Sequence, residues 1–373
     1  MIKENAIFSL EQANKGRQLE LDLVKGLAIV FMLLVHCFEE FSAWPLPKSI
    51  STYIIRFLGS PPAAPAFMFA LGIGIVYSRN SSPKALVTRG IKLFLLGFIL
   101  NFFRDFLPEL VLYHKTGELS HYAEAFNFLW GVDILPFAAL AFIFFGIAAK
   151  FKFREIDYGL AAVVFAGLNL LLKDIAIEGE ALNIFLGLFW GTNEYTWFPF
   201  LTWIAFPISG YLFGKLLIHC VDKRRFYRIS FWASLPVLGL FWIYAYKNGV
   251  DFGPLDGLFV EAYFHHDLIG NIVLIAFTVM WTSLIYFLSF HLPAFAKQAL
   301  SRWSKNITTM YCVHWLIIGW SRTILPLPLS LPWILLYFVL LLAVTDLISV
   351  YYLKLKARVT DYIKTARGAA QTG

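Results

Sequence analysis

The sequence predicts an all-α, polytopic integral membrane protein, and its composition and apolar pattern carry that prediction. Hydrophobic residues make up 59% of the 373 residues and charged residues only 15%, whereas a soluble domain has about a quarter charged residues. Ten apolar runs approach or exceed the roughly 20 residues that a helix needs to cross a bilayer. They lie at about 21–42, 53–77, 86–106, 125–148, 157–173, 196–218, 229–247, 268–290, 306–322 and 332–353.

The second run is interrupted near its outer end by Pro61, Pro62 and Pro65. Such breaks are tolerated inside a membrane only against protein or a cavity. The prolines are explained equally well as the start of a helix that packs through small residues. In either case we expect Gly72 and Gly74 to allow a close approach between helices.

The chain is expected to form one transmembrane domain. Residues 1–20 and 354–373 are predicted to be short cytoplasmic segments, because no linker or low-complexity stretch marks a second domain. The runs at 157–173 and 306–322 are the shortest. The stretch 181–190 is apolar but too short to cross, so we expect a re-entrant or surface segment there.

Lysine and arginine residues predict the orientation of the bundle. Of the 31 basic residues, 24 fall on the N-terminal side or in alternate loops, and 7 fall toward the opposite side. Because cytoplasmic loops are enriched in these residues, ten spans with this distribution place both termini in the cytoplasm. The same distribution explains the net charge of +7, so we do not expect nucleic acid as a partner.

No metal site, disulfide framework or cleavable signal peptide is expected. The three cysteines are odd in number and lack metal-ligand spacing; they are Cys37, Cys220 and Cys312. Polar residues of the outer side, among them His121, Asp133 and the pair in "FHHDL" (264–268), are better explained as a solvated loop than as metal ligands. The N-terminal segment is polar, and no small-residue cleavage site follows the first apolar run.

The first apolar run carries a polar stripe made by Asp22, Lys25 and His36. Lys25 and His36 are eleven residues apart, which on a helix is three turns plus about 20° and about 16 Å along the axis. Such a stripe has to face protein or a water-filled cavity. A lysine there can bind the phosphates of a cytosolic cofactor, and a histidine can act as base or nucleophile. Alternatively, Lys25 extends to the headgroups and His36 only hydrogen-bonds a neighbouring helix.

A second polar group lies in "RWSKNITTMYCVHWLIIGW" (302–320). Basic residues precede Asn306, and His314 follows about 12 Å further along the helix, near the middle of the bilayer. A buried, hydrogen-bonded structural role and a catalytic role explain His314 equally well.

Four stretches resemble motifs of polytopic membrane acyltransferases, in the expected order. They are "LELDLVKGLAIVFMLLVH" (19–36), "APAFMFALGIGIVYSR" (64–79), "WFPFLTWIAFPISGYLFGKLL" (197–217) and "WSKNITTMYCVHWLIIG" (303–319). That superfamily includes the heparan-α-glucosaminide N-acetyltransferase family and the acyltransferase 3 glycan O-acyltransferases. Its hallmark has arginine where this chain has Lys25, and lysine cannot make the planar bidentate contact with phosphate.

The resemblance implies transfer of an acyl group, acetyl in the first instance, from cytosolic acetyl-CoA to an amine or hydroxyl of a saccharide on the opposite side. His36 and His314 are the implied catalytic residues. The implied donor-binding residues are Asp22, Lys25, Arg79, Lys305 and Asn306. The acceptor is expected to meet loops in 107–124, 174–195 and 248–267.

The expected partners are the acyl donor, the saccharide and the bilayer, and a homodimer is compatible with the sequence. The expected location is the inner membrane of a bacterium. A non-catalytic transporter or flippase of polar glycans on the same bundle is the alternative, because it would need a similar intramembrane polar stripe.

Overall fold

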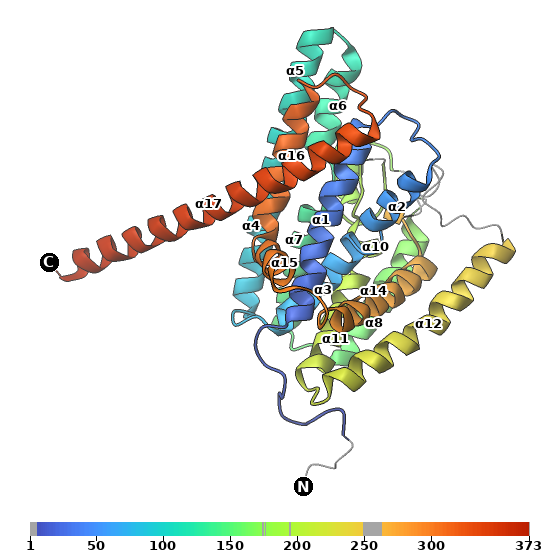
Figure 1. Cartoon of the computed structure of the whole chain (residues 1–373), viewed down its shortest axis with the longest axis vertical. Helices are drawn as coiled ribbons and strands as arrows, with labels where there is room; N and C mark the ends of the chain where they lie inside the picture. The colour runs from blue at the N-terminus through green and yellow to red at the C-terminus, as the bar shows by residue number, and fades with distance from the viewer. Residues whose placement is uncertain (1–5, 174, 176, 194, 249–262, 373) are drawn as a thin grey trace.

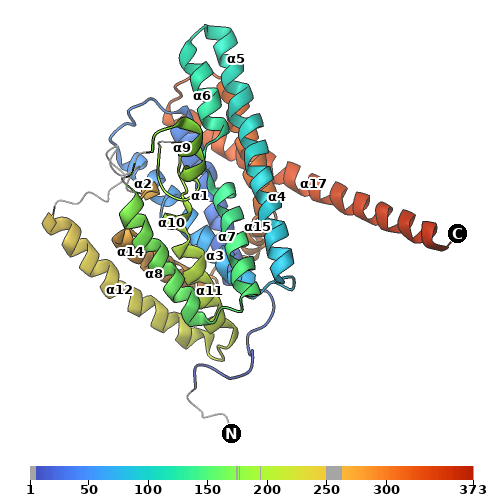
Figure 2. The same cartoon turned by 180° about the vertical axis from the view of Figure 1, so that it is seen from behind.

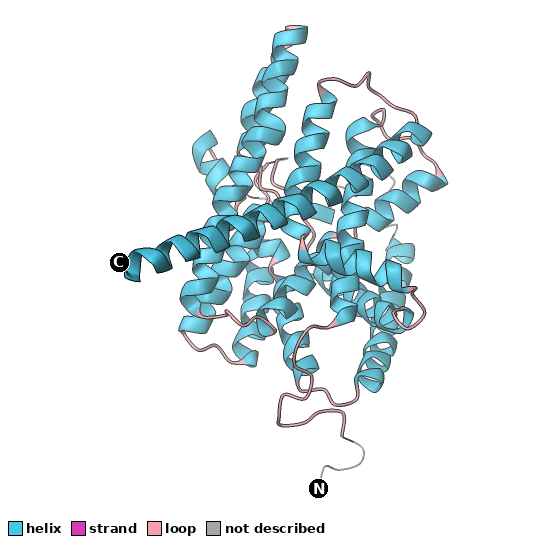
Figure 3. Ribbon diagram, turned by 60° about the vertical axis from the view of Figure 1, so that its left-hand side comes forward, coloured by secondary structure: helices cyan, strands magenta, loops and turns pink. Residues whose placement is uncertain are grey.

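The computed structural model describes residues 6–173, 175, 177–193, 195–248 and 263–372. Within these residues all extended regular elements are helices (Figures 1 and 3). The only β-type pairing among them consists of two isolated bridges, Phe8 with Cys220 and Val132 with Thr196. The predicted all-α class is therefore confirmed. Residues 249–262, which fall in one expected acceptor loop, lie outside the described chain.

The described chain contains helices of very different length. The elements are α1 (Leu19–Phe41), α2 (Ile50–Gly59), α3 (Ala64–Val76), α4 (Pro83–Asn101), the π-helix η1 (Phe102–Phe106), α5 (Leu107–Thr116), α6 (Leu119–Leu129), α7 (Ile134–Lys150), α8 (Glu155–Leu172), α9 (Glu180–Gly187), α10 (Phe200–Trp203), α11 (Ala205–Ile218), α12 (Lys223–Asn248), α14 (Leu268–Leu288), α15 (Ala294–Lys305), α16 (Ile307–Arg322) and α17 (Leu331–Thr372).

Eight helical segments of the described chain are long and apolar enough to cross a membrane. They are Leu19–Phe41, Ile50–Val76, Pro83–Thr116, Glu155–Leu172, Phe200–Ile218, Lys223–Asn248, Leu268–Leu288 and Leu331–Val359. The two other expected spans coincide with α7 and α16, which have 17 and 16 residues. The chain is thus a multi-pass helical membrane protein, while the count of ten spans and the side of the termini stay predictions.

The second predicted span is two helices, because the chain breaks between α2 and α3. Ser60–Ala63 forms turns rather than helix, and the carbonyl of Ser60 accepts hydrogen bonds from the N–H of Ala63 at 3.1 Å and from the hydroxyl of Tyr263 at 3.0 Å. Gly59, Ser60 and Ala64 line a cavity of about 510 Å³ inside the bundle. The break therefore lies against a cavity, while Pro65 stands in the first turn of α3, which packs through Gly72, so both explanations of the prolines fit the structure.

Two segments extend beyond the bundle. The hairpin of α5 and α6 stands at the top in Figures 1 and 2, where the sequence suggested a loop over 107–124. Lys115 ties it to the end of α16 by donating to the carbonyl of Thr323 at 2.7 Å. Helix α17 continues without a break past the predicted span 332–353 and projects well away from the other helices (Figures 1 and 2).

Glycines let α3 cross α11 at very short distance. A Cβ at Gly72 would overlap the carbonyl oxygen of Pro207, and a Cβ at Gly210 would overlap that of Phe69. The prediction for Gly72 is confirmed. It is wrong for Gly74, which has open space around its Cα on the other face of the same helix, because residues two apart point to different sides of a helix.

We expect Gly72→Ala to lower the free energy of unfolding by about 1–3 kcal/mol, because the added methyl group forces two backbones apart. The matched control is Gly74→Ala on the same helix, which removes the conformational freedom of glycine without a clash and should be neutral or slightly stabilising. Thermal unfolding of the purified variants in detergent measures both. Equal melting temperatures for the two variants would contradict the observed crossing.

Candidate functional site

A cavity of about 510 Å³ lies where α1, α2, η1 and α16 meet, toward the C-terminal end of α1. Its apolar wall is largely aromatic and includes Phe128, Trp197, Phe198, Phe264 and Trp315. Its polar lining consists of His36, Glu39, Glu40, Arg56, Ser60, Arg104, Asp105, Asp133, Tyr263, Tyr311 and Arg322. Aromatic walls with a few convergent polar groups are typical of sites for small polar ligands.

The two predicted catalytic histidines form one hydrogen-bonded pair. Nδ1 of His36 lies 3.0 Å from Nε2 of His314. The ring planes differ by 6° and the ring centroids are 5.3 Å apart, which is the geometry of two imidazoles meeting edge to edge in one plane. His36 lines the cavity, whereas the side chain of His314 is fully buried behind it.

The partners of the two rings determine where the protons lie when both are neutral. The carbonyl of Met310 can only accept, so His314 donates to it from Nδ1, at 3.0 Å. Nε2 of His314 is then an acceptor, and His36 donates to it from Nδ1. This leaves the Nε2 lone pair of His36 as the basic atom of the pair. The arrangement can therefore take a proton from, or make a bond to, a group in the cavity.

The arginines of the cavity are paired with its carboxylates. Arg56 lies 3.7 Å from Glu39, and Arg322 lies 3.4 Å from Glu40. Arg104 makes two ion pairs of 2.6 Å, one with its neighbour Asp105 and one with Asp133. Buried charges are stable only when they are paired and hydrogen-bonded in this way.

Asp133 and His266 are buried, so their predicted place in a solvated loop is wrong. Asp133 caps α7 through Ile134 and accepts from Arg104. His266 is 3% exposed and contacts the carbonyl of Tyr263 and the side chain of Asn271. Loss of hydration around its ring lowers the pKa of His266. The loops that carry these residues fold back into the bundle, which their polar sequence did not indicate.

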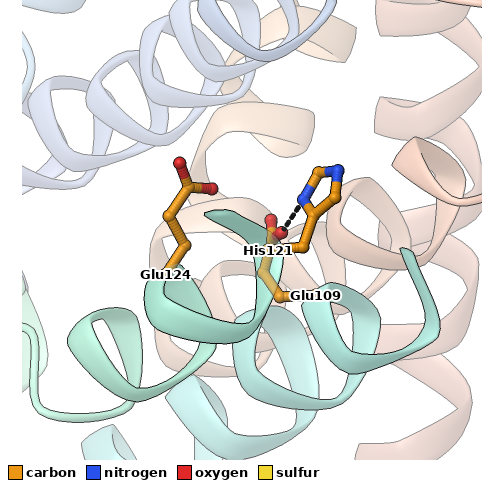
Figure 4. A group of neighbouring side chains, drawn as sticks. All are labelled: Glu109, His121 and Glu124. Carbon is orange, nitrogen blue, oxygen red and sulfur yellow. Dashed lines mark hydrogen bonds and ion pairs between the residues drawn. The ribbon is translucent and has the colours of Figure 1, made fainter. Parts of the chain in front are cut away.

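Glu109, His121 and Glu124 form the group in the described chain whose donor atoms lie close enough to hold a metal ion (Figure 4). Glu109 is fully buried, and its carboxylate already accepts from His121 at 2.7 Å and from Arg322 at 2.6 Å. A cation would have to replace the hydrogen bond between His121 and Glu109, and the guanidinium of Arg322 already neutralises that carboxylate. These residues therefore fit an ion-pair network that fastens the α5–α6 hairpin to α16 better than they fit a metal site.

At the other end of α1, Asp22 organises the predicted donor-binding group. Its carboxylate pairs with Arg17 and Lys25, the latter at 3.6 Å, and accepts from Ser304 at 2.9 Å. A Cβ at Gly26 would overlap the carbonyl of Leu300, so this glycine allows α1 to pack closely on α15. The hydrogen bond to Ser304 joins α1 to the last turn of α15, next to Lys305 and Asn306, across 282 residues of the chain.

The remaining donor-binding residues differ in exposure. Asn306 is buried at the junction of α15 and α16, whereas Arg79 and Lys305 are exposed on the same side of the bundle. Nothing in this geometry assigns them a ligand, so their role stays a prediction.

A second pocket, of about 580 Å³, lies beside the N-terminal half of α4 and was missed by the sequence analysis. Its polar lining consists of Asn80, Ser82, Lys84, Thr88, Arg89, Lys92 and Thr308. Ser82 caps α4, and the N-terminus of a helix favours bound anions. The three cations within the first ten residues of α4, Lys84, Arg89 and Lys92, are the signal that could have indicated it.

The family model for the acyltransferase domain matches residues 18–350, which is nearly the whole chain. The chain belongs to the acyltransferase 3 family. No curated protein and no solved structure matches it. This acyltransferase therefore carries the predicted fold and general activity, and its histidine pair lies within the matched residues.

Other cavity residues of this acyltransferase were not predicted as site residues. Arg56, Arg104 and Arg322 are three of the 7 basic residues assigned to the outer side, and all three line the cavity. An ionisable residue within an apolar run is a functional candidate by default. That rule, applied to arginine as it was to His36, would have found them.

Proposed function

We propose that the chain transfers an acyl group, acetyl in the first instance, from a CoA thioester to an amine or hydroxyl of a saccharide. The donor binds on the side of the N-terminus, and the acceptor enters the 510 Å³ cavity from the opposite side. The observation that carries this proposal is the His36–His314 pair at the wall of that cavity in a member of the acyltransferase 3 family. As part of the same inference, we propose that the chain is related to the heparan-α-glucosaminide N-acetyltransferase family.

His36 supplies the chemistry through Nε2. It takes the proton of the acceptor hydroxyl or amine while the acceptor oxygen or nitrogen attacks the thioester carbonyl. The carbon–sulfur bond then breaks, and the CoA thiolate recovers the proton from the imidazolium. Alternatively Nε2 attacks the carbonyl first and CoA leaves as the thiolate; the acceptor then takes the acyl group from Nε2, and its proton passes to the thiolate. In both routes His314 holds the His36 ring in one tautomer and one orientation, as the third member of a triad does.

The basic pocket beside α4 is the proposed site for the phosphates of the donor. Lys84, Arg89 and Lys92 give it three cations, and Ser82 and Thr88 add hydroxyl groups. Thr308, which also lines this pocket, is six residues before His314 on α16, or about 9 Å along the helix. An extended pantetheine arm can follow this helix from the basic pocket toward the histidine pair.

We expect the Lys84→Gln and Arg89→Gln variants each to bind acetyl-CoA about tenfold more weakly than the wild type, because each loses a hydrogen bond between charged groups, which contributes about 1.5 kcal/mol. Calorimetry on the detergent-purified protein measures this. Lys150→Gln, an exposed lysine at the end of α7 outside the pocket, is the matched control and should bind normally.

The calorimetric titrations with acetyl-CoA distinguish the two possible phosphate sites, and they distinguish the acyltransferase from a transporter. Weakened binding in Lys25→Ala alone, with Lys84→Gln and Arg89→Gln unchanged, would move the phosphate site to the end of α1. A well-folded wild type that binds neither acetyl-CoA nor longer acyl-CoA esters would contradict the donor assignment. In that case the same cavity would support the glycan transporter or flippase.

The inner membrane of a bacterium is the location that we propose for this activity. There the acyl donor is cytosolic and the acceptor saccharide lies in the cell envelope. The positive surplus on the side of the N-terminus agrees with that orientation.

A further inference from the structure

Arg104 is a buried cation for which the proposed reaction has no role so far. Its side chain is 4% exposed, and its carboxylate partners, Asp105 and Asp133, are almost as deeply buried. The guanidinium carbon lies 4.4 Å from the ring centre of Trp315. Burying such a group in a membrane protein is costly, and an apolar contact could join the same helices at lower cost. The group is therefore expected to serve the cavity that it lines.

The local sequence explains why Arg104 reaches the cavity. In an α-helix its carbonyl would accept from the N–H of residue 108, but Pro108 has none. The helix widens here into the π-helix η1, in which the N–H of Leu107 bonds to the carbonyl of Phe102. The carbonyl of Arg104 instead faces Gly319 of α16, where any side chain would overlap it. Single-turn π-helices occur frequently at functional sites.

Trp315 connects Arg104 to the histidine pair. The indole ring lies against the His36 imidazole with ring centroids 4.2 Å apart and planes tilted by 30°. Asp133, which holds Arg104, also accepts a 2.5 Å hydrogen bond from the hydroxyl of Tyr311. Tyr311 and Trp315 are one turn apart on α16. One carboxylate thus fixes both the cation and the helix face that presents the indole to His36.

We propose that Arg104 is a positioning residue: it holds Trp315 against His36, so that Nε2 of His36 is presented to the group that reacts in the cavity. This role rests on the proposed function, because it assigns the acyl-transfer chemistry to His36. Lysine cannot replace Arg104 here, since only the planar guanidinium can stack on the indole while it donates to two carboxylates.

The first readout is kinetic. Arg104→Gln and Arg104→Lys should each lower kcat for acyl transfer about a hundredfold, as expected for a misplaced reacting group, with KM for acetyl-CoA within about twofold. Arg302→Gln is the matched control, because it removes another arginine with two hydrogen bonds to one carboxylate, Asp346, on an exposed surface. It should leave kcat unchanged.

The second readout does not need activity. Diethyl pyrocarbonate modifies accessible imidazoles, and mass spectrometry gives the rate for each histidine. In the two Arg104 variants His36 should react about tenfold faster than in the wild type, which corresponds to about 1.4 kcal/mol of lost restraint. His266, buried elsewhere by its contact with Asn271, is the internal reference and should not change. A general loosening of the fold would accelerate both.

If the Arg104 variants loosen the whole fold, Trp315→Leu and Tyr311→Phe test the positioning role instead. Both variants interrupt the connection from Arg104 to His36, and both keep the ion pairs of Arg104. Faster modification of His36 alone supports the positioning role. Unchanged modification of His36 in all four variants, or full kcat in Arg104→Lys, overturns it. A faster reaction of His36 in a protein whose wild type transfers no acyl group would overturn the proposed function and leave the positioning role standing.

Discussion

Replacing His36 with alanine should lower the rate of acyl transfer about a thousandfold, which is within the contribution of a positioned general base. His36 is the member of the histidine pair that lines the cavity, and its Nε2 is the basic atom of the pair. The rate is measured as release of free CoA from acetyl-CoA in the presence of an acceptor saccharide. The loss should fall on kcat, because the pocket proposed for the donor phosphates lies beside a different helix.

Two controls make the His36 result specific. Binding of acetyl-CoA to His36→Ala should stay within about twofold of the wild type, since the variant removes chemistry and not donor contacts. His114→Ala, an exposed histidine near the tip of the α5–α6 hairpin, should keep full activity. Undiminished CoA release by a well-folded His36→Ala variant would show that the histidine pair is structural.

Replacing His314 with phenylalanine should lower kcat about a hundredfold, because His36 then loses the acceptor that fixes its tautomer and ring orientation. Glutamine at this position should recover part of that loss. Its side-chain oxygen can take the place of Nε2 and accept from Nδ1 of His36. The order of kcat values is therefore expected to be wild type, His314→Gln, then His314→Phe.

The comparison between the two His314 variants distinguishes orientation from proton transfer. An amide can orient His36 but cannot exchange a proton near neutral pH. Equal loss in both variants would indicate that His314 itself accepts or donates a proton during the reaction. Full activity in both His314 variants would show that the 3.0 Å contact between Nδ1 of His36 and Nε2 of His314 has no role in catalysis.

Local pattern was sufficient to predict the two histidines of the site but not their contact. The spacing of Lys25 and His36 on one helix face follows from 3.6 residues per turn, and His314 stands out as an ionisable group in an apolar run. That His36 meets His314 across 278 residues is a property of packing. The ion pair between Arg104 and Asp133 is likewise a property of packing, since a contact between a π-helix and a loop has no sequence period.

The helical membrane architecture followed from composition, whereas the ends of the helices depended on tertiary contacts. The proline cluster at 61–65 indicated a break but could not show that a hydroxyl from Tyr263 satisfies it. The polar stretch 107–124 was expected as a loop and is mostly helix, because Glu109, His121 and Arg322 form an ion-pair network that holds the hairpin to α16. Burial of these charges could not be foreseen from their order in the chain.

The most direct test of the account is acyl transfer across a membrane by the purified protein. Proteoliposomes receive radiolabelled acetyl-CoA on the side of the N-terminus and a panel of hexoses, hexosamines and envelope polysaccharide fractions on the other side. We expect labelled acetyl groups on a saccharide and an equal amount of free CoA. The labelled saccharide and the CoA release should both be lost in His36→Ala. If acetyl-CoA binds but no member of the panel raises CoA release above the His36→Ala rate, the proposed transfer is contradicted.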